Sequence, residues 1–268
     1  MVSDPHPIRF LCVFASPRTG SSHFNKLLNS CPEIMAKAEL FHRHAVGKLR
    51  PAELQSMEKW SNGAVKDVET FKTWKHENPN AVFEAFRAVW KRRVVAFKIF
   101  PGHLPRDYIE KELLARDDMA FAILRRRPIE SFISGIKAKK GETFTLADTT
   151  AVKPALDFAT FTPWSERMMN WYGWAERKLQ EHGRSYAEIS FERHLDGRSG
   201  AESLALVLEE LEKAGLPKIP VPQKIIVGER QDRETDYRAR VANWGEFESS
   251  MRADPDRARL LDWAEAAR

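Results

Sequence analysis

The feature that most constrains the fold is a continuous apolar run that ends in a turn rich in hydroxyl groups. Residues 8–16 read IRFLCVFAS, and SPRTGSS occupies 16–22. An unbroken apolar run of this length is typical of a strand covered on both faces, as in a parallel sheet. Phe24, Leu27 and Leu28 then follow at helical spacing. The sequence therefore predicts a strand, a tight loop and a helix that begins at the loop.

The rest of the chain continues to alternate strands with helices. Further strands are expected at 33–39, 94–100, 119–125 and 185–192, and helices within 51–92, at 106–116, from Pro128, at 164–183, at 201–214 and after Tyr237. This alternation predicts an α/β fold of three layers, a mostly parallel central sheet with helices on both faces. Residues 140–163 show no clear period, and we expect them to form a long functional loop.

Composition limits the class of protein. A chain of 268 residues, 43% of them hydrophobic, predicts one domain over residues 1–268 with a sizeable core. It contains no apolar stretch of about 18–20 residues that would span a membrane. It also has no secretory signal, and two cysteines are too few for a disulfide framework, so we expect a cytoplasmic protein. The net charge of +5, from 43 bases and 38 acids, is compatible with an anionic ligand.

The turn at 16–22 has the composition of an anion-binding loop. Backbone N–H groups at a helix start converge on one point, aided by the positive end of the helix dipole. Thr19, Ser21 and Ser22 add hydroxyl donors, Arg18 adds a charge, and Gly20 permits the turn. The Walker pattern is absent, because Ser21 stands where its lysine would follow the glycine. The alternative is an ordinary turn in which Ser21 or Ser22 is the N-cap.

A second candidate anion site lies in LRRRPIESFISG at 124–135, directly after another predicted strand. Arg126 could clamp a phosphate, and Ser134 could reach it from the second turn of the helix that begins at Pro128. The alternative is a solvated basic cluster with a surface serine. Parallel strands end at one edge of a sheet, so we expect both sites to converge on opposite ends of one nucleotide.

The two segments together resemble the nucleotide motifs of sulfotransferases that use 3′-phosphoadenosine 5′-phosphosulfate (PAPS). SPRTGSS is similar to the 5′-phosphosulfate loop, and RRPIESFIS to the 3′-phosphate motif, in which a serine follows the arginine by eight residues. SFERHL at 190–195 is similar to the family's Tyr-Glu-x-Leu segment, with Phe191 in place of tyrosine. The resemblance spans roughly residues 8–195 and is strongest to the bacterial carbohydrate and glycolipid branch, which includes nodulation-type enzymes.

The resemblance implies a P-loop-like fold and a transferase that moves a sulfuryl group from PAPS to a hydroxyl of a carbohydrate, glycolipid or small molecule. The product would be 3′,5′-adenosine bisphosphate. Within 217–268, a basic segment would close over the nucleotide, with Arg230 and Gln231 as contacts, and 140–163 would lie on the acceptor side. The other nucleotide contacts implied are Arg18, Thr19, Gly20, Ser21, Ser22, Arg126 and Ser134. A sulfuryl group carries one negative charge where a terminal phosphoryl group carries nearly two, so neither a Walker lysine nor a metal ion is required.

Three residues are candidates for the chemistry. In the branch that the chain resembles, a glutamate near the end of the second strand is the base, and Glu39 stands there. FKIFPGHLP resembles the family's Lys-x-His-Leu-Pro segment, but His103 follows Lys98 by five residues instead of two, which leaves His103 as the alternative base. Lys98 belongs to a buried strand, where an unpaired ammonium is costly. We expect it to reach an anion at the strand end, such as the bridging oxygen of the leaving group, unless it points to solvent. His42 and His44 could contact the acceptor.

Two other functions remain open from the sequence. One is a P-loop-like kinase that uses ATP, which the missing Walker lysine and the lack of an obvious Mg²⁺ carboxylate pair disfavour. The other is a non-catalytic anion or nucleic-acid binder, which would need clustered bases, whereas the bases here alternate with acids. The expected partners are the nucleotide donor and the hydroxyl acceptor, without nucleic acid. The sequence is compatible with a homodimer.

Overall fold

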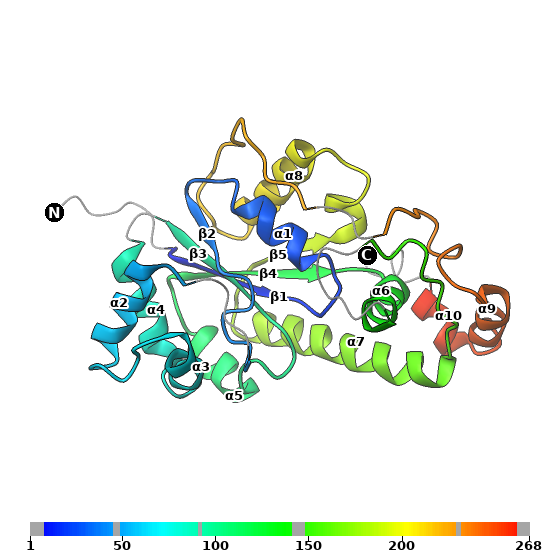
Figure 1. The fold of residues 1–268 in the computed structure, drawn as a ribbon, viewed down its shortest axis with the longest axis horizontal. Helices are drawn as coiled ribbons and strands as arrows, with labels where there is room; N and C mark the ends of the chain where they lie inside the picture. Colours follow the sequence, from blue (N-terminus) through cyan, green and yellow to red (C-terminus); the bar gives the residue numbers. More distant parts are fainter. Residues whose placement is uncertain (1–7, 45–48, 91–92, 141–147, 229–231, 262–268) are drawn as a thin grey trace.

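A five-stranded parallel sheet lies at the centre of the protein, with strand order β2-β3-β1-β4-β5 (Figure 1). The structure is a computed structural model that describes residues 8–44, 49–90, 93–140, 148–228 and 232–261. The strands are β1 (Phe10–Phe14), β2 (Ile34–Ala36), β3 (Val94–Ile99), β4 (Met119–Arg125) and β5 (Tyr186–Ser190). Each strand falls within a predicted one, which confirms the α/β class and the parallel sheet.

Helices cover both faces of the sheet because successive strand residues point to opposite sides. On β1, Phe10 and Phe14 pack into one hydrophobic cluster, while Leu11 and Val13 pack into another. The first cluster includes residues of the helices α2 (Pro51–Trp60), α3 (Val68–Glu77), α4 (Pro79–Val89) and α7 (Phe158–Glu181). The second includes residues of α1 (Ser21–Leu28) and α8 (Gly200–Lys213). Figure 1 shows α1 and α8 on the face of the sheet opposite α7.

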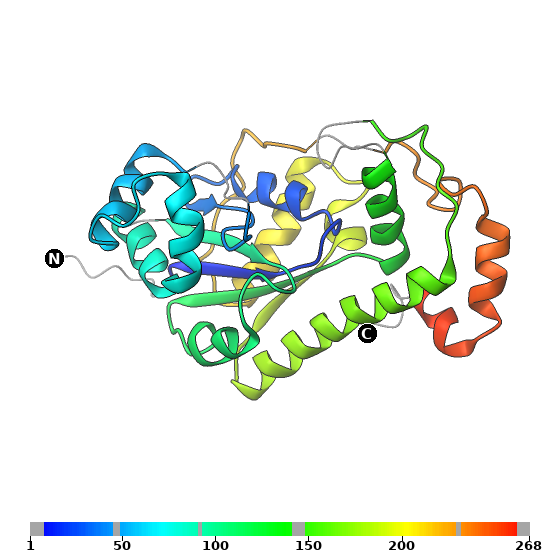
Figure 2. The ribbon, with the colours of Figure 1, turned by 60° about the horizontal axis from the view of Figure 1, so that its bottom comes forward.

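A third hydrophobic cluster lies beyond the end of β4. It joins α7 to α6 (Pro128–Lys140), α9 (Trp244–Arg252) and α10 (Pro255–Leu261). Figure 2 shows α7 running along the sheet toward α9 and α10. The remaining short elements are α5 (Arg106–Tyr108) and the π-helical turns η1 (Ile109–Leu113) and η2 (Phe191–Leu195). In the part of the chain that the structure describes, no helix has both the length and the apolar character needed to cross a membrane.

The bounds predicted for the loop at 140–163 are wrong, because helices extend into this range from both sides. Helix α6 includes Lys140, and α7 begins at Phe158. Asp157 caps α7 by accepting from the backbone N–H groups of Ala159 and Thr160. Pro163 lies in the second turn of α7, where it removes one intrahelical hydrogen bond without ending the helix. Residues 141–147 lie outside the described residues.

Two buried side chains of α7 hold the carboxyl ends of β1 and β4. The indole Nε1 of Trp171 donates to the Ala15 carbonyl at 2.9 Å, and the Tyr172 hydroxyl donates to the Leu124 carbonyl at 2.9 Å. Each carbonyl lies where its strand gives way to a predicted anion loop. Helix α7 therefore positions both loops relative to the sheet.

Candidate active site

The turn between β1 and α1 is arranged as an open helix N-terminus. Gly20 occupies the N-cap with φ 80°, and no side chain of the described residues caps the helix. The alternative that Ser21 or Ser22 is the N-cap is therefore wrong. The Thr19 hydroxyl donates to the Ser16 carbonyl at 2.7 Å and is fully buried, so it closes the loop itself. The remaining donors toward a ligand are backbone N–H groups and the hydroxyls of Ser21 and Ser22.

The two predicted anion sites are in contact. The Arg18 Nε donates to the Ser134 Oγ at 3.0 Å, and an Nη of Arg126 donates to the Arg18 carbonyl at 3.3 Å. The Arg126 guanidinium lies 4.3 Å from the centre of the Phe191 ring, and 10% of its side chain is exposed. A solvated basic cluster does not describe this arrangement. The two segments converge at the carboxyl edge of the sheet, as the parallel topology predicts.

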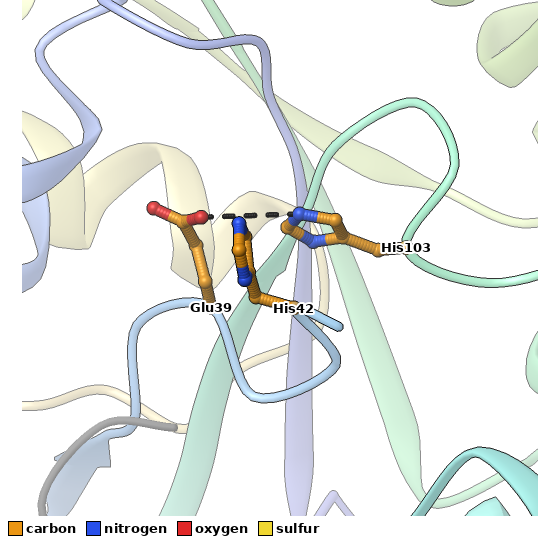
Figure 3. A group of neighbouring side chains, drawn as sticks. All are labelled: Glu39, His42 and His103. Carbon is orange, nitrogen blue, oxygen red and sulfur yellow. Dashed lines mark ion pairs between the residues drawn. The ribbon is translucent and has the colours of Figure 1, made fainter. Parts of the chain in front are cut away.

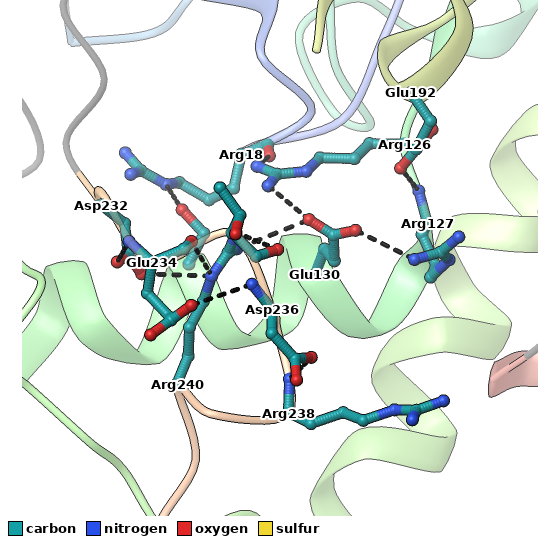
Figure 4. A network of polar contacts seen from close by, with 12 residues as sticks. Arg18, Arg126, Arg127, Glu130, Glu192, Asp232, Glu234, Asp236, Arg238 and Arg240 are labelled. Atoms are coloured by element: carbon teal, nitrogen blue, oxygen red, sulfur yellow. Dashed lines mark hydrogen bonds and ion pairs between the residues drawn. The ribbon is translucent and has the colours of Figure 1, made fainter. Parts of the chain in front are cut away.

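A buried carboxylate joins these arginines to the C-terminal segment (Figure 4). Glu130 pairs with Arg126 at 2.8 Å, with Arg127 at 3.2 Å and with Arg240 at 3.5 Å. Burial acts to raise the pKa of Glu130, but the three guanidinium groups outweigh it and lower that pKa. Asp232 extends the network to Lys137 at 2.5 Å. The network fixes residues 232–240 against α6, while Arg230 and Gln231 lie outside the described residues.

Lys98 connects the anion loop to the candidate base. Its buried Nζ donates to the Ser21 Oγ at 2.8 Å and lies 3.3 Å from the Glu39 Oε1. Burial lowers the pKa of Lys98, and the Glu39 carboxylate opposes that shift. The alternative that Lys98 points to solvent is wrong. Glu39 has 32% of its side chain exposed, so it is partly open to solvent while its carboxylate contacts Lys98.

His103 reaches the same place because a turn absorbs the extra residues that separate it from Lys98. Gly102 has φ 84°, and the Phe100 N–H donates to the His103 Nδ1 at 3.2 Å. The Nε2 lies 3.8 Å from the Glu39 Oε2 (Figure 3). Burial, together with the nearby His42, Lys75 and Lys98, lowers the pKa of His103 to about 4. The ring is therefore neutral at pH 7, and its proton lies on the Nε2 that faces Glu39.

Glu39, His42 and His103 also form a group that a metal ion could bridge, because one ligand atom of each lies within 4.8 Å of the others (Figure 3). A metal binds the lone pair of a neutral imidazole nitrogen. However, both Nδ1 atoms accept a backbone N–H, from Phe100 for His103 and from His44 for His42. A ring whose Nδ1 accepts a hydrogen bond carries a proton on Nε2, and the Lys98 ammonium lies beside the carboxylate. An Nε2–H group can donate to the Glu39 carboxylate or to a substrate oxygen, whereas a metal ion would need that nitrogen without its proton.

Sequence analysis missed two charged residues near this site. Glu130 follows Arg127 by three residues and Arg126 by four. These are the spacings of ion pairs on a helix, so the sequence could have indicated Glu130 as their partner. Lys75 lies on the buried face of α3 with Phe71 and Trp74. A lysine at that position carries no sequence signal that separates it from a surface lysine.

Comparison with known proteins gave likenesses to solved structures. No protein-family model matches the chain, and no curated protein matches it. One similar solved structure is a sulfotransferase from Alicyclobacillus acidocaldarius, 17% identical, with a TM-score of 0.45 and coverage of 95% of this chain and 96% of that one. Another is the sulfotransferase domain of the Synechococcus PCC 7002 olefin synthase, 14% identical, with a TM-score of 0.49 and coverage of 97% and 96%. At these values the likeness says nothing of activity, which must be inferred from the site.

Replacing Gly20 by alanine should destabilise the protein more than the same change at Gly63. Both glycines have left-handed backbones, with φ of 80° and 82°, a conformation that costs an L-residue about 1–2 kcal/mol. A Cβ at Gly20 would also lie 2.3 Å from the Cδ2 of Phe191, whereas a Cβ at Gly63 meets nothing within 4 Å. Denaturant unfolding of Gly20→Ala and Gly63→Ala measures the difference. Equal losses would show that Phe191 does not restrain the turn.

The folded state should lose stability on acidification through the titration of His103. The unfolded chain binds a proton at the ordinary histidine pKa near 6.5, whereas folded His103 stays neutral down to about 4. The unfolded state therefore binds more protons between these values, and the free energy of unfolding falls as the pH drops through that window. Denaturant unfolding at several pH values should show a shallower slope for His103→Gln than for the wild type. Identical slopes would contradict the assignment.

Proposed function

We propose that the protein is a sulfotransferase that moves the sulfuryl group of PAPS to a hydroxyl of a carbohydrate, glycolipid or small-molecule acceptor. The observation that carries the proposal is the convergence of three groups at one edge of the sheet. These are the open turn before α1, the clamp formed by Arg126 before α6 and Ser134 within it, and the Glu39–Lys98 pair. Their contacts support the pairing of motifs that the sequence resemblance implies.

The donor would bind across the first two groups. The uncapped start of α1 and the Ser21 and Ser22 hydroxyls suit the 5′-phosphosulfate. Arg126 and Ser134 suit the 3′-phosphate, because a guanidinium and a hydroxyl donate to phosphate oxygens at the same end. Arg18 contacts Ser134 and so lies between the two groups. The segment 232–240, fixed by Arg240, would border the nucleotide.

The reaction would be an in-line transfer at sulfur. Glu39 takes the proton of the acceptor hydroxyl as its oxygen forms a bond to sulfur, and the bond from sulfur to the bridging oxygen breaks. The electron pair of that bond leaves with 3′,5′-adenosine bisphosphate, next to the positive charge of Lys98. His103, a neutral donor facing Glu39, suits the orienting of the carboxylate more than proton abstraction. The tautomers of His42 and His103 favour transfer without a metal ion.

Removing Arg126 should weaken nucleotide binding. A charge-assisted hydrogen bond contributes about 1.5–3 kcal/mol, which corresponds to about a tenfold to hundredfold loss of affinity for 3′,5′-adenosine bisphosphate. Calorimetric titration of Arg126→Ala measures this, with Arg127→Ala as the matched control that removes a guanidinium from the same Glu130 carboxylate. Equal effects of the two variants, or none, would count against a 3′-phosphate site at Arg126.

In thermal-shift assays, stabilisation by ATP with Mg²⁺ alone would favour the kinase, and stabilisation by an oligonucleotide alone would favour the nucleic-acid binder.

Replacing Glu39 by glutamine should separate binding from turnover. The amide keeps the size and polarity of the side chain but cannot accept the proton, so turnover should fall about 10²–10⁴-fold. Affinity for 3′,5′-adenosine bisphosphate should stay close to that of the wild type. Transfer of labelled sulfate from PAPS to a panel of hydroxyl acceptors measures turnover. Full activity of Glu39→Gln would show that another group is the base.

A further inference from the structure

Lys75 is a fully buried lysine of α3 that the proposed reaction does not use. Its Nζ donates to the Leu40 carbonyl at 3.0 Å and to the His42 carbonyl at 2.6 Å, and it lies 5.8 Å from the centre of the Phe71 ring. A buried ammonium is stable only where hydrogen bonds replace its water. Burial, with the nearby charge of Lys72, lowers the pKa of Lys75 to about 8, so most of the population is charged at neutral pH.

The two carbonyls belong to the irregular segment that carries the candidate base. Strand β2 pairs with β3 as far as Ala36, and residues 38–42 follow after the strand has ended. Buried carbonyls that lack a strand partner need another donor. Lys75 supplies that donor from a different element, on both sides of the buried Phe41. Lys75 thus bonds the backbone at two points immediately after Glu39.

The backbone before Glu39 is fixed separately. The Ala38 N–H donates to the Asn25 Oδ1 at 3.0 Å, and the Lys98 N–H donates to the Ala38 carbonyl at 2.8 Å. Ala38 has φ 53°, a left-handed conformation that a non-glycine residue keeps only where its surroundings impose it. Glu39 therefore lies between two fixed points of the backbone. Ala38 precedes it and is bonded to α1 and β3, and the turn at 40–42 follows it and is bonded to α3.

We propose that Lys75 is a positioning residue of the reaction, which holds the turn at 40–42 so that the Glu39 carboxylate stays against Lys98 and His103. The inference rests on the proposed function. Without Lys75, the Leu40 and His42 carbonyls each lose the hydrogen bond from its buried ammonium, and the turn can shift away from the sheet edge. A displacement of about 1 Å at a reacting group can reduce turnover about a hundredfold. The nucleotide groups lie at the start of α1 and around the start of α6, away from the 40–42 turn that Lys75 holds, so they should keep their geometry.

The test compares Lys75→Met, Lys75→Arg and Val82→Ala. Val82 is a fully buried residue of α4 in the hydrophobic cluster that also contains Phe71 of α3. Its truncation therefore reports the effect of lost stability alone. Lys75→Met should reduce turnover of PAPS about tenfold or more, with affinity for 3′,5′-adenosine bisphosphate within about twofold of the wild type. Lys75→Arg, which keeps the charge and the donors, should restore part of the turnover. Val82→Ala should retain turnover.

Amide hydrogen exchange gives a readout that needs no activity. In Lys75→Met, exchange should increase over residues 38–44 and remain unchanged over residues 18–28. Exchange unchanged over 38–44, or turnover of Lys75→Met equal to that of Val82→Ala, would overturn the proposal. If wild-type protein binds 3′,5′-adenosine bisphosphate but transfers no sulfuryl group to any acceptor, the proposed function fails. The anchoring by Lys75 would then still be judged by exchange.

Discussion

The geometry of the site depends on the buried ammonium group of Lys98. Moving a charge out of water costs several kcal/mol unless polar partners replace the lost hydration. Lys98 finds those partners on two other segments, through Ser21 at the start of α1 and Glu39 after β2. Separating Lys98 from Ser21 and Glu39 would cost free energy. The turn at 16–22 and Glu39 are therefore kept within reach of the Lys98 ammonium on β3. The position of Glu39 is therefore a consequence of burying a lysine in the strand next to β1.

The sheet and the main site could be predicted because both follow from local pattern and topology. Each strand is an apolar run of the right length, since a parallel sheet is buried on both faces. Once the strands are known to be parallel, residues just after their ends must share an edge. This reasoning places Glu39 with Lys98 and Arg18 with Arg126, and the contacts agree. The roles of these residues and the extent of the domain stay predictions.

What could not be predicted depends on the course of irregular backbone. His103 returns to the site because Gly102 takes a left-handed turn. The family pattern, in which the histidine follows the lysine by two residues, does not reveal such a turn. The direction of the Thr19 hydroxyl depends on the shape of its loop. Lys75 looks like a surface lysine until the fold shows that its neighbours are buried. Helix α7 begins earlier than expected, at Phe158, because Asp157 caps it and the helix continues through Pro163, although residues 140–163 show no clear period.

The arginines of the site are closer together than their own charges favour. Burial lowers the pKa of Arg18, and the charge of Arg126 lowers it further, which is the mark of repulsion between like charges. Glu130 compensates for the charge of Arg126, and Arg240 shares the same carboxylate. Arg18 also has a left-handed backbone, with φ 69°, although it is not glycine. Repulsion and backbone strain of this kind persist where a ligand gains from them. An anion that accepts from both guanidinium groups would relieve the repulsion, and the doubly charged 3′-phosphate of the proposed donor is such an anion.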